Sequence, residues 1–184
     1  MVRVAARPAA AGGARRRAAG AAAARRQIAE TLIGVFERWG YAQVITPAFE
    51  YEAVLALGLG SDGRASALRF VEPSSGQVLA LRPDITPQVA RLMATRFREE
   101  LGPIRMCYEG PVFRYDSAAR AQKELIQAGV ELAGIDGADG DVEVISTALE
   151  ALSAAGLPEV TIDLAHPGLA RAVIEAVRLP EEWV

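Results

Sequence analysis

Several polar side chains on three predicted elements are of the types that could bind a small charged molecule. Two carboxylates beside a neutral amide can hold an ammonium group and an imidazole ring, and a guanidinium can hold a carboxylate or a phosphate through its planar fork. This polar set comprises Arg82, Asp84, Thr86, Arg114, Gln127 and Glu131. If the strands that carry them are neighbours, the side chains share one surface. Spacing alone, however, favours a solvated sheet face with ordinary surface charges.

The sequence offers little for the commoner kinds of catalytic or metal site. His166 is the only histidine and no Gly-x-Ser-x-Gly segment accompanies it, so we expect it to cap or pack and not to serve in a triad. One histidine and one cysteine cannot complete a zinc site, and the aspartates within 136–141 lack the calcium-loop pattern. The glycines within 58–63 match no phosphate-loop spacing and predict a flexible turn. We therefore expect no catalytic residue, no metal site and no cofactor.

The elements that precede the polar set are predicted from hydrophobic spacing and from turn residues. Apolar residues at three- and four-residue spacing predict a helix over 27–39, which a glycine ends. Residues 41–46 are predicted to form a strand that ends at a proline. Two further strands, 67–72 and 77–81, flank Pro-Ser-Ser-Gly and predict a hairpin.

The polar set itself lies on the next elements of the chain. Thr86 is predicted to cap a helix that continues through Pro87 to about residue 99. Strands are predicted at 104–108 and 112–115, with a Gly-Pro pair bending the chain between them and Arg114 on the second strand.

A strand over 125–133 is predicted by its strict alternation of residue types. Gln127, Gly129 and Glu131 would face one side of the sheet, and the apolar residues between them would face the core. This strand would present the amide and one carboxylate of the polar set on a common surface.

The remaining elements complete the prediction of the fold class. A helical stripe covers 142–152, a strand is expected at 160–164, and a last helix at 168–178. Adjacent antiparallel strands with helices between and after them predict an α+β domain with an antiparallel sheet flanked by helices, not a regularly alternating parallel sheet.

The composition predicts one globular domain behind an unusual tail. Residues 1–25 are rich in alanine and arginine, lack acidic and aromatic residues, and are predicted to be disordered, whereas 26–184 would form the domain. No apolar run is long enough to cross a bilayer, and a net charge of -3 gives no general attraction to nucleic acid. We therefore expect a protein that binds neither membrane nor nucleic acid. Because the single Cys107 cannot form an internal disulfide, nothing points to an oxidising compartment, and we expect the protein to be cytoplasmic.

Four segments in the correct order resemble the core of the class II aminoacyl-tRNA synthetases, specifically its histidyl branch, over roughly residues 27–178. Residues 40–50, Gly-Tyr-Ala-Gln-Val-Ile-Thr-Pro-Ala-Phe-Glu, resemble motif 1, which builds the dimer interface of that family. Residues 81–91, Leu-Arg-Pro-Asp-Ile-Thr-Pro-Gln-Val-Ala-Arg, are similar to the segment that meets the amino acid. Residues 108–114, Tyr-Glu-Gly-Pro-Val-Phe-Arg, and 127–134, Gln-Ala-Gly-Val-Glu-Leu-Ala-Gly, resemble the two strands of motif 2.

Within that branch, the second and fourth segments resemble ATP phosphoribosyltransferase regulatory subunits more closely than synthetases. The synthetases usually carry glutamate where Asp84 stands, and their motif 2 loop is rich in arginine and glutamine. Here that loop, residues 115–124, is short and alanine-rich, and so is poorly equipped to hold ATP and the tRNA acceptor end. The resemblance implies a non-catalytic subunit that is required for ATP phosphoribosyltransferase activity in the first step of histidine biosynthesis.

The resemblance also implies a ligand and partners. Asp84, Thr86, Gln127 and Glu131 would surround a bound histidine, with Arg114 at the position that contacts the α-phosphate in the synthetases. Such a pocket would mediate feedback if histidine binds better to an inhibited arrangement of the whole complex. The expected partners are the short-form catalytic subunit in a hetero-oligomer and a second copy of this chain, joined through the motif 1 region.

Two departures from the family pattern leave other hypotheses open. The chain stops at Val184, before the family's later histidine-contacting loop and motif 3, so we expect a core that is incomplete at its C-terminus. Its alanine- and arginine-rich start replaces the proline, glycine and aspartate pattern that precedes the first helix in the family. The alternatives are a histidyl-tRNA synthetase fragment that adenylates histidine and an inactive structural remnant.

Overall fold

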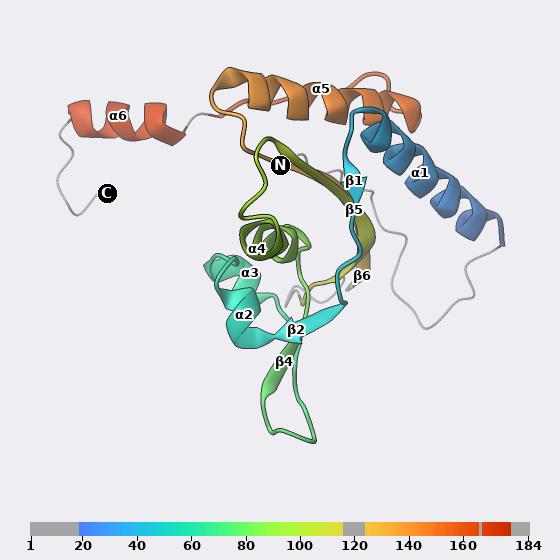
Figure 1. The fold of residues 1–184 in the computed structure, drawn as a ribbon, viewed down its shortest axis with the longest axis vertical. Helices are drawn as coiled ribbons and strands as arrows, with labels where there is room; N and C mark the ends of the chain where they lie inside the picture. The colour runs from blue at the N-terminus through green and yellow to red at the C-terminus, as the bar shows by residue number, and fades with distance from the viewer. Residues whose placement is uncertain (1–18, 116–123, 166, 178–184) are drawn as a thin grey trace.

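The computed structural model describes residues 19–115, 124–165 and 167–177, and its main body is built in three layers (Figure 1). The middle layer is a sheet in the order β1-β5-β6, made of β1 (Ala42–Gln43), β5 (Ile104–Phe113) and β6 (Glu124–Ala133). Strands β5 and β6 are antiparallel, whereas β1 runs parallel to β5. Helices flank this sheet on both faces, and the predicted α+β class is confirmed.

One face of the sheet packs against α1 (Ala19–Arg38) and α5 (Ala138–Ala154). Val35 and Phe36 of α1 are buried there against Cys107 of β5 and Ala151 of α5. The helix predicted at 27–39 begins earlier, at Ala19, so the prediction of disorder is wrong for residues 19–25. A run of alanine has the highest helix propensity and extends the helix without burial. Residues 1–18 of the predicted tail lie outside the described residues.

The other face of the sheet packs against α4 (Thr86–Arg96). Ile85, Val89 and Met93 bring the start and middle of this helix onto Met106 and Val112 of β5. The helix predicted from residue 86 to about 99 is therefore confirmed, ending three residues early. The position of this helix matters because Gln127 and Glu131 on the sheet face its start.

A second, smaller sheet has the order β2-β4-β3 and is antiparallel throughout. Its strands are β2 (Phe49–Tyr51), β3 (Arg69–Val71) and β4 (Val78–Leu81), and α2 (Glu52–Ala56) and α3 (Ser61–Ala65) follow β2. The predicted hairpin is thus confirmed as β3 and β4 and projects from the body in Figure 1. Of the glycines predicted to lie in a turn, Gly58 and Gly60 join α2 to α3, whereas Gly63 lies within α3.

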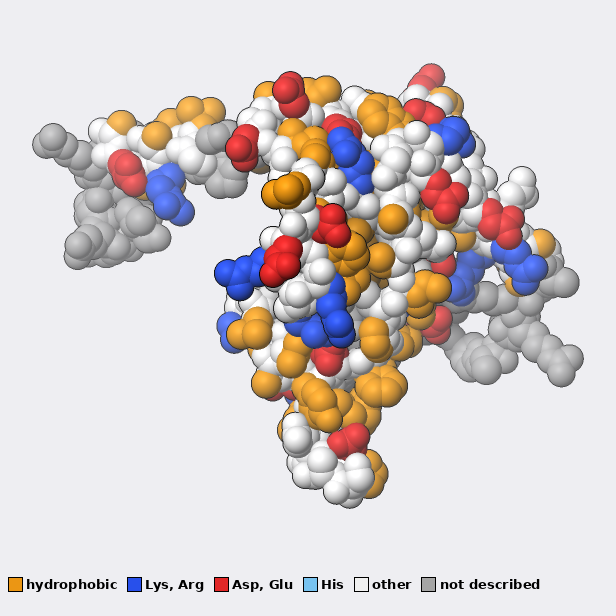
Figure 2. Space-filling view, viewed as in Figure 1, with side chains coloured by type: hydrophobic (Ala, Val, Ile, Leu, Met, Phe, Trp, Pro, Cys, Tyr) orange, Lys and Arg blue, Asp and Glu red, His pale blue; other side chains and the backbone are white. Residues whose placement is uncertain are grey.

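Apolar side chains lie on both faces of the small sheet. Leu55 of α2, Ala67 and Ala80 form a core on one face. Phe49 and Phe70 contact each other edge to face, with ring centroids 6.1 Å apart, and both remain about half exposed. Hydrophobic side chains accordingly gather around the projecting hairpin in Figure 2.

The prediction of two strands separated by a bend at Gly110-Pro111 is wrong. Strand β5 is continuous for ten residues, and both of these residues pair in register with β6. The reason is Arg82, whose guanidinium lies across the strand: a Cβ on Gly110 would be 2.5 Å from its Nη2 atom, and its Nε donates to the carbonyl of Pro111 at 2.8 Å. Gly110 makes room for a buried arginine here, and the Gly-Pro pair does not mark a turn.

Two further strand predictions differ from the structure. The strand expected at 41–46 pairs only at residues 42–43, although the amide of Val44 still donates to the carbonyl of Cys107 at 2.9 Å. Residues 160–164 form no strand, because none of the described strands lies beside them to complete a ladder. Strand-forming residues alone do not make a strand when no partner offers backbone groups.

The last described element is α6 (Pro167–Val177), which confirms the helix predicted at 168–178 apart from Arg178, a residue outside the described part. It stands away from the three-layer body in Figure 1, and Val173 and Ile174 on it are exposed. His166, predicted to cap or pack, also lies outside the described residues. No helix within the described ranges is long and apolar enough to cross a membrane.

Candidate functional site

The register between β5 and β6 decides which side chains face α4. Tyr108 lies opposite Gly129, and Met106 lies opposite Glu131. Because residues two apart on a strand share a face, Gln127, Gly129 and Glu131 lie on the side of the sheet that α4 covers. The alternation predicted for this strand is confirmed, since residues 128, 130 and 132 pack against the opposite core.

Gln127 links β6 to the start of α4. Its Oε1 accepts a hydrogen bond from the amide of Ile85 at 3.0 Å, and its Nε2 donates to Oδ1 of Asp84 at 2.9 Å. The same Oδ1 accepts the amide of Thr86 at 3.0 Å. The prediction that Thr86 caps the helix is therefore wrong, because Asp84 receives the free amide and the hydroxyl of Thr86 turns towards the sheet.

Tyr108 completes the cluster, and the sequence reasoning did not single it out. Its hydroxyl lies 3.0 Å from Oγ1 of Thr86, 3.3 Å from Oε1 of Glu131 and 3.4 Å from Nε2 of Gln127. A signal for it existed in the sequence, because a glycine inside a strand often marks a close approach. A Cβ on Gly129 would be 2.6 Å from the phenol oxygen of Tyr108.

Arg114 closes the cluster from the end of β5. It lies just beyond the strand, where a strand residue was predicted, because pairing with β6 stops at Phe113. Its Nε donates to the carbonyl of Pro83 at 2.8 Å, and its Nη2 lies 4.0 Å from Oδ2 of Asp84. The structure thus brings together all five side chains predicted to bind a ligand, namely Asp84, Thr86, Arg114, Gln127 and Glu131.

Arg82 is the member of the polar set that does not join this cluster. It is 5 % exposed and turns to the backbone of the segment before β2, where its Nη1 donates to the carbonyls of Thr46 and Pro47 at 2.7 and 3.2 Å. Burial lowers the pKa of its guanidinium, with the nearby Glu109 carboxylate opposing that effect. Arg82 therefore links the segment before β2 to strand β5.

Glu131 is the electrostatically unusual member of the cluster. Burial raises the pKa of its carboxyl, the hydroxyls of Thr86 and Tyr108 partly oppose this, and the Asp84 carboxylate adds to it. No basic side chain of the described residues forms an ion pair with Glu131. A half-buried carboxylate without a cation favours a ligand that brings a positive charge or N–H donors.

This environment makes the stability of the protein depend on the charge of Glu131. A raised carboxyl pKa means that the ionised form costs free energy in the folded state, so the contribution to stability is present below the ordinary pKa and lost as pH rises through the folded value. We expect Glu131→Gln to raise the melting temperature at pH 7, and the gain to shrink towards pH 4. Thermal unfolding followed by circular dichroism at the two pH values measures this.

Glu143 on α5 is the matched control because its pKa moves the other way. Arg105 binds it with two hydrogen bonds of 2.7 Å and lowers its pKa, so its stabilising contribution is present at neutral pH and lost on acidification. Glu143→Gln should therefore lower the melting temperature at pH 7. Equal losses of melting temperature in the two variants at pH 7 would contradict the conclusion that burial disfavours the ionised form of Glu131.

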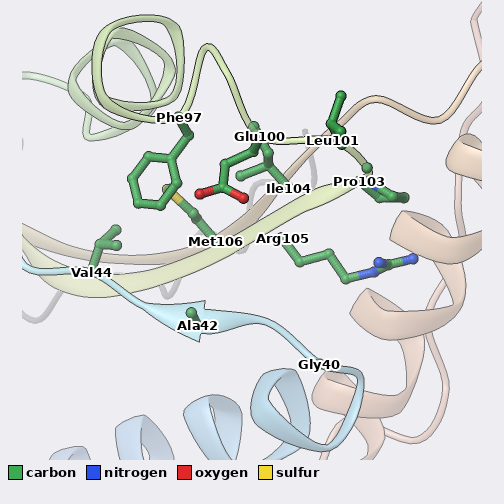
Figure 3. A pocket seen from close by; sticks show the side chains of 11 residues that line it. Gly40, Ala42, Val44, Phe97, Glu100, Leu101, Pro103, Ile104, Arg105 and Met106 are labelled. Atoms are coloured by element: carbon green, nitrogen blue, oxygen red, sulfur yellow. The ribbon is translucent and has the colours of Figure 1, made fainter.

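A groove lies on the same sheet face, beyond the C-terminal end of α4 (Figure 3). It has a volume of about 380 Å³ and a largely apolar lining that includes Val44, Phe97, Leu101, Ile104 and Met106. In Figure 3 the carboxylate of Glu100 lies over it, while Arg105 extends towards α5. None of the five clustered residues lines this groove. It is a separate apolar surface beside β1.

No group of three potential metal ligands comes together in the parts of the chain that the structure describes. The aspartates of the segment 136–141, which sequence reasoning set aside as calcium ligands, lie at the start of α5 and in the loop before it. The polar cluster of carboxylates, amide, hydroxyls and guanidinium is suited to hydrogen bonding with a small zwitterion.

The antiparallel pair of β5 and β6 between α4 and the α1/α5 layer, with a polar cluster under α4, defines a core like that of the class II aminoacyl-tRNA synthetases. The chain belongs to the histidyl-tRNA synthetase family, since the family model described as "Histidyl-tRNA synthetase" matches residues 13–183.

Several curated proteins that are similar to this chain carry the name ATP phosphoribosyltransferase regulatory subunit. The one from Geobacter sulfurreducens is 43 % identical over 143 residues, covering 77 % of this chain and 33 % of its own. The one from Moorella thermoacetica is 40 % identical over 160 residues, covering 86 % of this chain and 41 % of its own. The chain thus spans between a third and a half of the length of these relatives.

A solved structure from Bacillus halodurans C, described as an ATP phosphoribosyltransferase regulatory subunit/histidyl-tRNA synthetase, superposes with a TM-score of 0.77. It is 29 % identical in sequence, and the match covers 88 % of this chain and 41 % of that one. Sequence and structure therefore place this chain next to proteins that carry the regulatory name.

Proposed function

We propose that this chain acts in histidine biosynthesis as a non-catalytic regulatory subunit that ATP phosphoribosyltransferase requires for activity. The observation that supports this most strongly is the identity of 40 % or more to regulatory subunits over most of the chain. The relatives' names connect them with the phosphoribosyltransferase, so its catalytic subunit, in the short form, is the proposed partner in a cytoplasmic hetero-oligomer.

The partner can be tested directly with purified components. The short-form catalytic subunit should co-purify with this chain and should turn over substrate only when the chain is present. A catalytic subunit that is fully active alone would overturn the requirement. Activation without stable co-purification would retain the function and limit the partnership to a weak one.

We further propose that the cluster of Asp84, Thr86, Arg114, Gln127 and Glu131 binds histidine and mediates feedback. The two carboxylates and the amide suit an ammonium group and an imidazole, and the guanidinium suits the carboxylate of an amino acid. Histidine inhibits only if it binds better to an inhibited arrangement of the complex, and a coupling free energy of about 1 to 3 kcal/mol is enough for this. The cluster would then sense histidine without performing chemistry.

The apolar groove beside β1 supports a homodimer through the motif 1 region. Ile45, next to β1, is 89 % exposed, and Leu101, in the lining of the groove, is fully exposed. Exposed apolar surface of this kind marks contact regions. The proposed assembly is therefore two copies of this chain joined at that surface within the hetero-oligomer.

A histidyl-tRNA synthetase activity is the second candidate, because the family model carries that name. Residues 116–123 of the loop at 115–124, whose alanine-rich sequence argues against ATP and tRNA binding, lie outside the described residues. Histidine-dependent exchange of pyrophosphate into ATP by the purified chain distinguishes the two. We expect no exchange, and measurable exchange would favour the synthetase.

A further inference from the structure

We propose that Tyr108 is a positioning residue of the histidine pocket, whose hydroxyl orients the Glu131 carboxylate towards the ligand. This inference rests on the proposed function, because it concerns the same pocket.

The direction of the hydrogen bonds follows from Gln127. Its Oε1 accepts from the amide of Ile85, so its Nε2 must point the other way, towards Asp84 and the phenol oxygen of Tyr108. Tyr108 therefore accepts a hydrogen from Gln127 and keeps its own single hydrogen for another acceptor.

Glu131 is the acceptor that suits this hydrogen best. The phenol oxygen lies 3.3 Å from Oε1 of Glu131 and 3.0 Å from the hydroxyl of Thr86. Thr86 also hydrogen-bonds to Glu131, and its single hydroxyl hydrogen serves either that carboxylate or Tyr108. In either arrangement the hydrogen of Tyr108 is available to Glu131, and a bond to a charged acceptor is the stronger one.

The packing of the two strands fixes the position of the Tyr108 ring. Tyr108 is 3 % exposed and lies across Gly129 on the neighbouring strand, where any Cβ would meet its ring or its oxygen. The ring is thus held between β6 and α4, and its hydroxyl has little freedom to leave Glu131. Burial also raises the pKa of the phenol, so the group remains a neutral donor.

The titratable groups that face Glu131 come from both elements packed on its side of the sheet. Tyr108 approaches from β5, and Asp84 approaches from the turn before α4. Arg114 lies against Asp84, and Arg91 of α4 pairs with Glu50 of β2. Helices α1 and α5 pack on the opposite face of β6. Tyr108 is accordingly the buried hydrogen-bond donor on β5 that keeps Glu131 ionised when a cationic group binds.

The test is the pH dependence of histidine binding in Tyr108→Phe, measured by calorimetry with L-histidine and the full chain between pH 5 and pH 8. The loss of a hydrogen bond to a charged group should raise the dissociation constant about tenfold at pH 7. The fall in affinity on acidification should also begin at a higher pH than in the wild type. The imidazole of free histidine titrates identically in both experiments, so only the difference between the proteins is read.

Tyr41→Phe is the matched control. Tyr41 is equally buried, and its hydroxyl also donates to a glutamate, Glu143, at 3.0 Å, but on the other face of the sheet. This variant should bind histidine as the wild type does at every pH. Gly129→Ala provides a second variant that keeps the phenol but displaces it, and it should weaken binding in the same direction as Tyr108→Phe.

The outcomes separate the two proposals. Wild-type binding with an unchanged pH profile in Tyr108→Phe and in Gly129→Ala would overturn the role of Tyr108 and leave the histidine site standing. A wild-type chain that binds no histidine would overturn the site and this inference together. A shifted profile in both variants but not in Tyr41→Phe supports the role of Tyr108.

Discussion

Arg82→Met is expected to lower the free energy of unfolding by about 3 kcal/mol, the largest effect on stability that a single substitution in this chain should show. The guanidinium of Arg82 donates to three carbonyl oxygens, those of Thr46, Pro47 and Pro111, and to the hydroxyl of Thr46. These acceptors belong to the segment before β2 and to β5. Without the arginine, these partly buried carbonyls lose their partners, and each such loss costs about 1 to 3 kcal/mol.

Urea unfolding of the variant and of Arg38→Met measures this effect. Arg38 is an exposed arginine on α1 that contacts Glu150 at 3.0 Å and the carbonyl of Gly34, so its replacement should cost about 0.5 kcal/mol or less. A loss in Arg82→Met no greater than in Arg38→Met would show that the buried contacts contribute nothing to stability.

Asp84→Asn is expected to weaken histidine binding about 100-fold, the largest effect on ligand binding. The carboxylate of Asp84 accepts hydrogen bonds from Gln127 and from the amide of Thr86, and it lies close to Arg114. Asparagine has the same shape and still offers one oxygen to the Thr86 amide, but it removes the negative charge available to an ammonium group. The fold should therefore persist while affinity falls.

Calorimetry with histidine tests this substitution, with Glu143→Gln as the control. Glu143 is also a partly buried carboxylate paired with an arginine, but it lies between α5 and β5, on the other face of the sheet. Its replacement should leave the dissociation constant within about twofold of the wild type, which is below 0.5 kcal/mol. An Asp84→Asn chain that folds and binds histidine normally would remove Asp84 from the site.

Much of the scaffold could be predicted from local patterns. The alternation in 125–133 assigned Gln127, Gly129 and Glu131 to one face correctly, because the period of a strand is two in any context. The hairpin and the helix that contains Pro87 were also predicted, since turn residues and proline act through their own backbone geometry. The motifs then indicated which of these elements come together in space.

The errors share a physical cause. Gly110 and Pro111 were predicted to form a turn because the arginine that crosses this strand lies 28 residues earlier in the sequence. Residues 160–164 were predicted to form a strand, although none of the described strands lies alongside them. Thr86 was predicted to be a cap because the tyrosine that attracts its hydroxyl lies on β5, 22 residues later in the sequence. Each decision depends on a partner that is remote in the chain.

The sequence by itself determined the family, the fold class and the identity of the five polar residues, because residue types, their periodicity and their order along the chain carry that information. Only the tertiary structure decided that Asp84 and Gln127 bind each other, that Tyr108 links Thr86 to Glu131, and that Arg82 serves the backbone and not the pocket. Hydrogen bonds depend on distance and direction to within a few tenths of an ångström, and the packing of β5, β6 and α4 sets both.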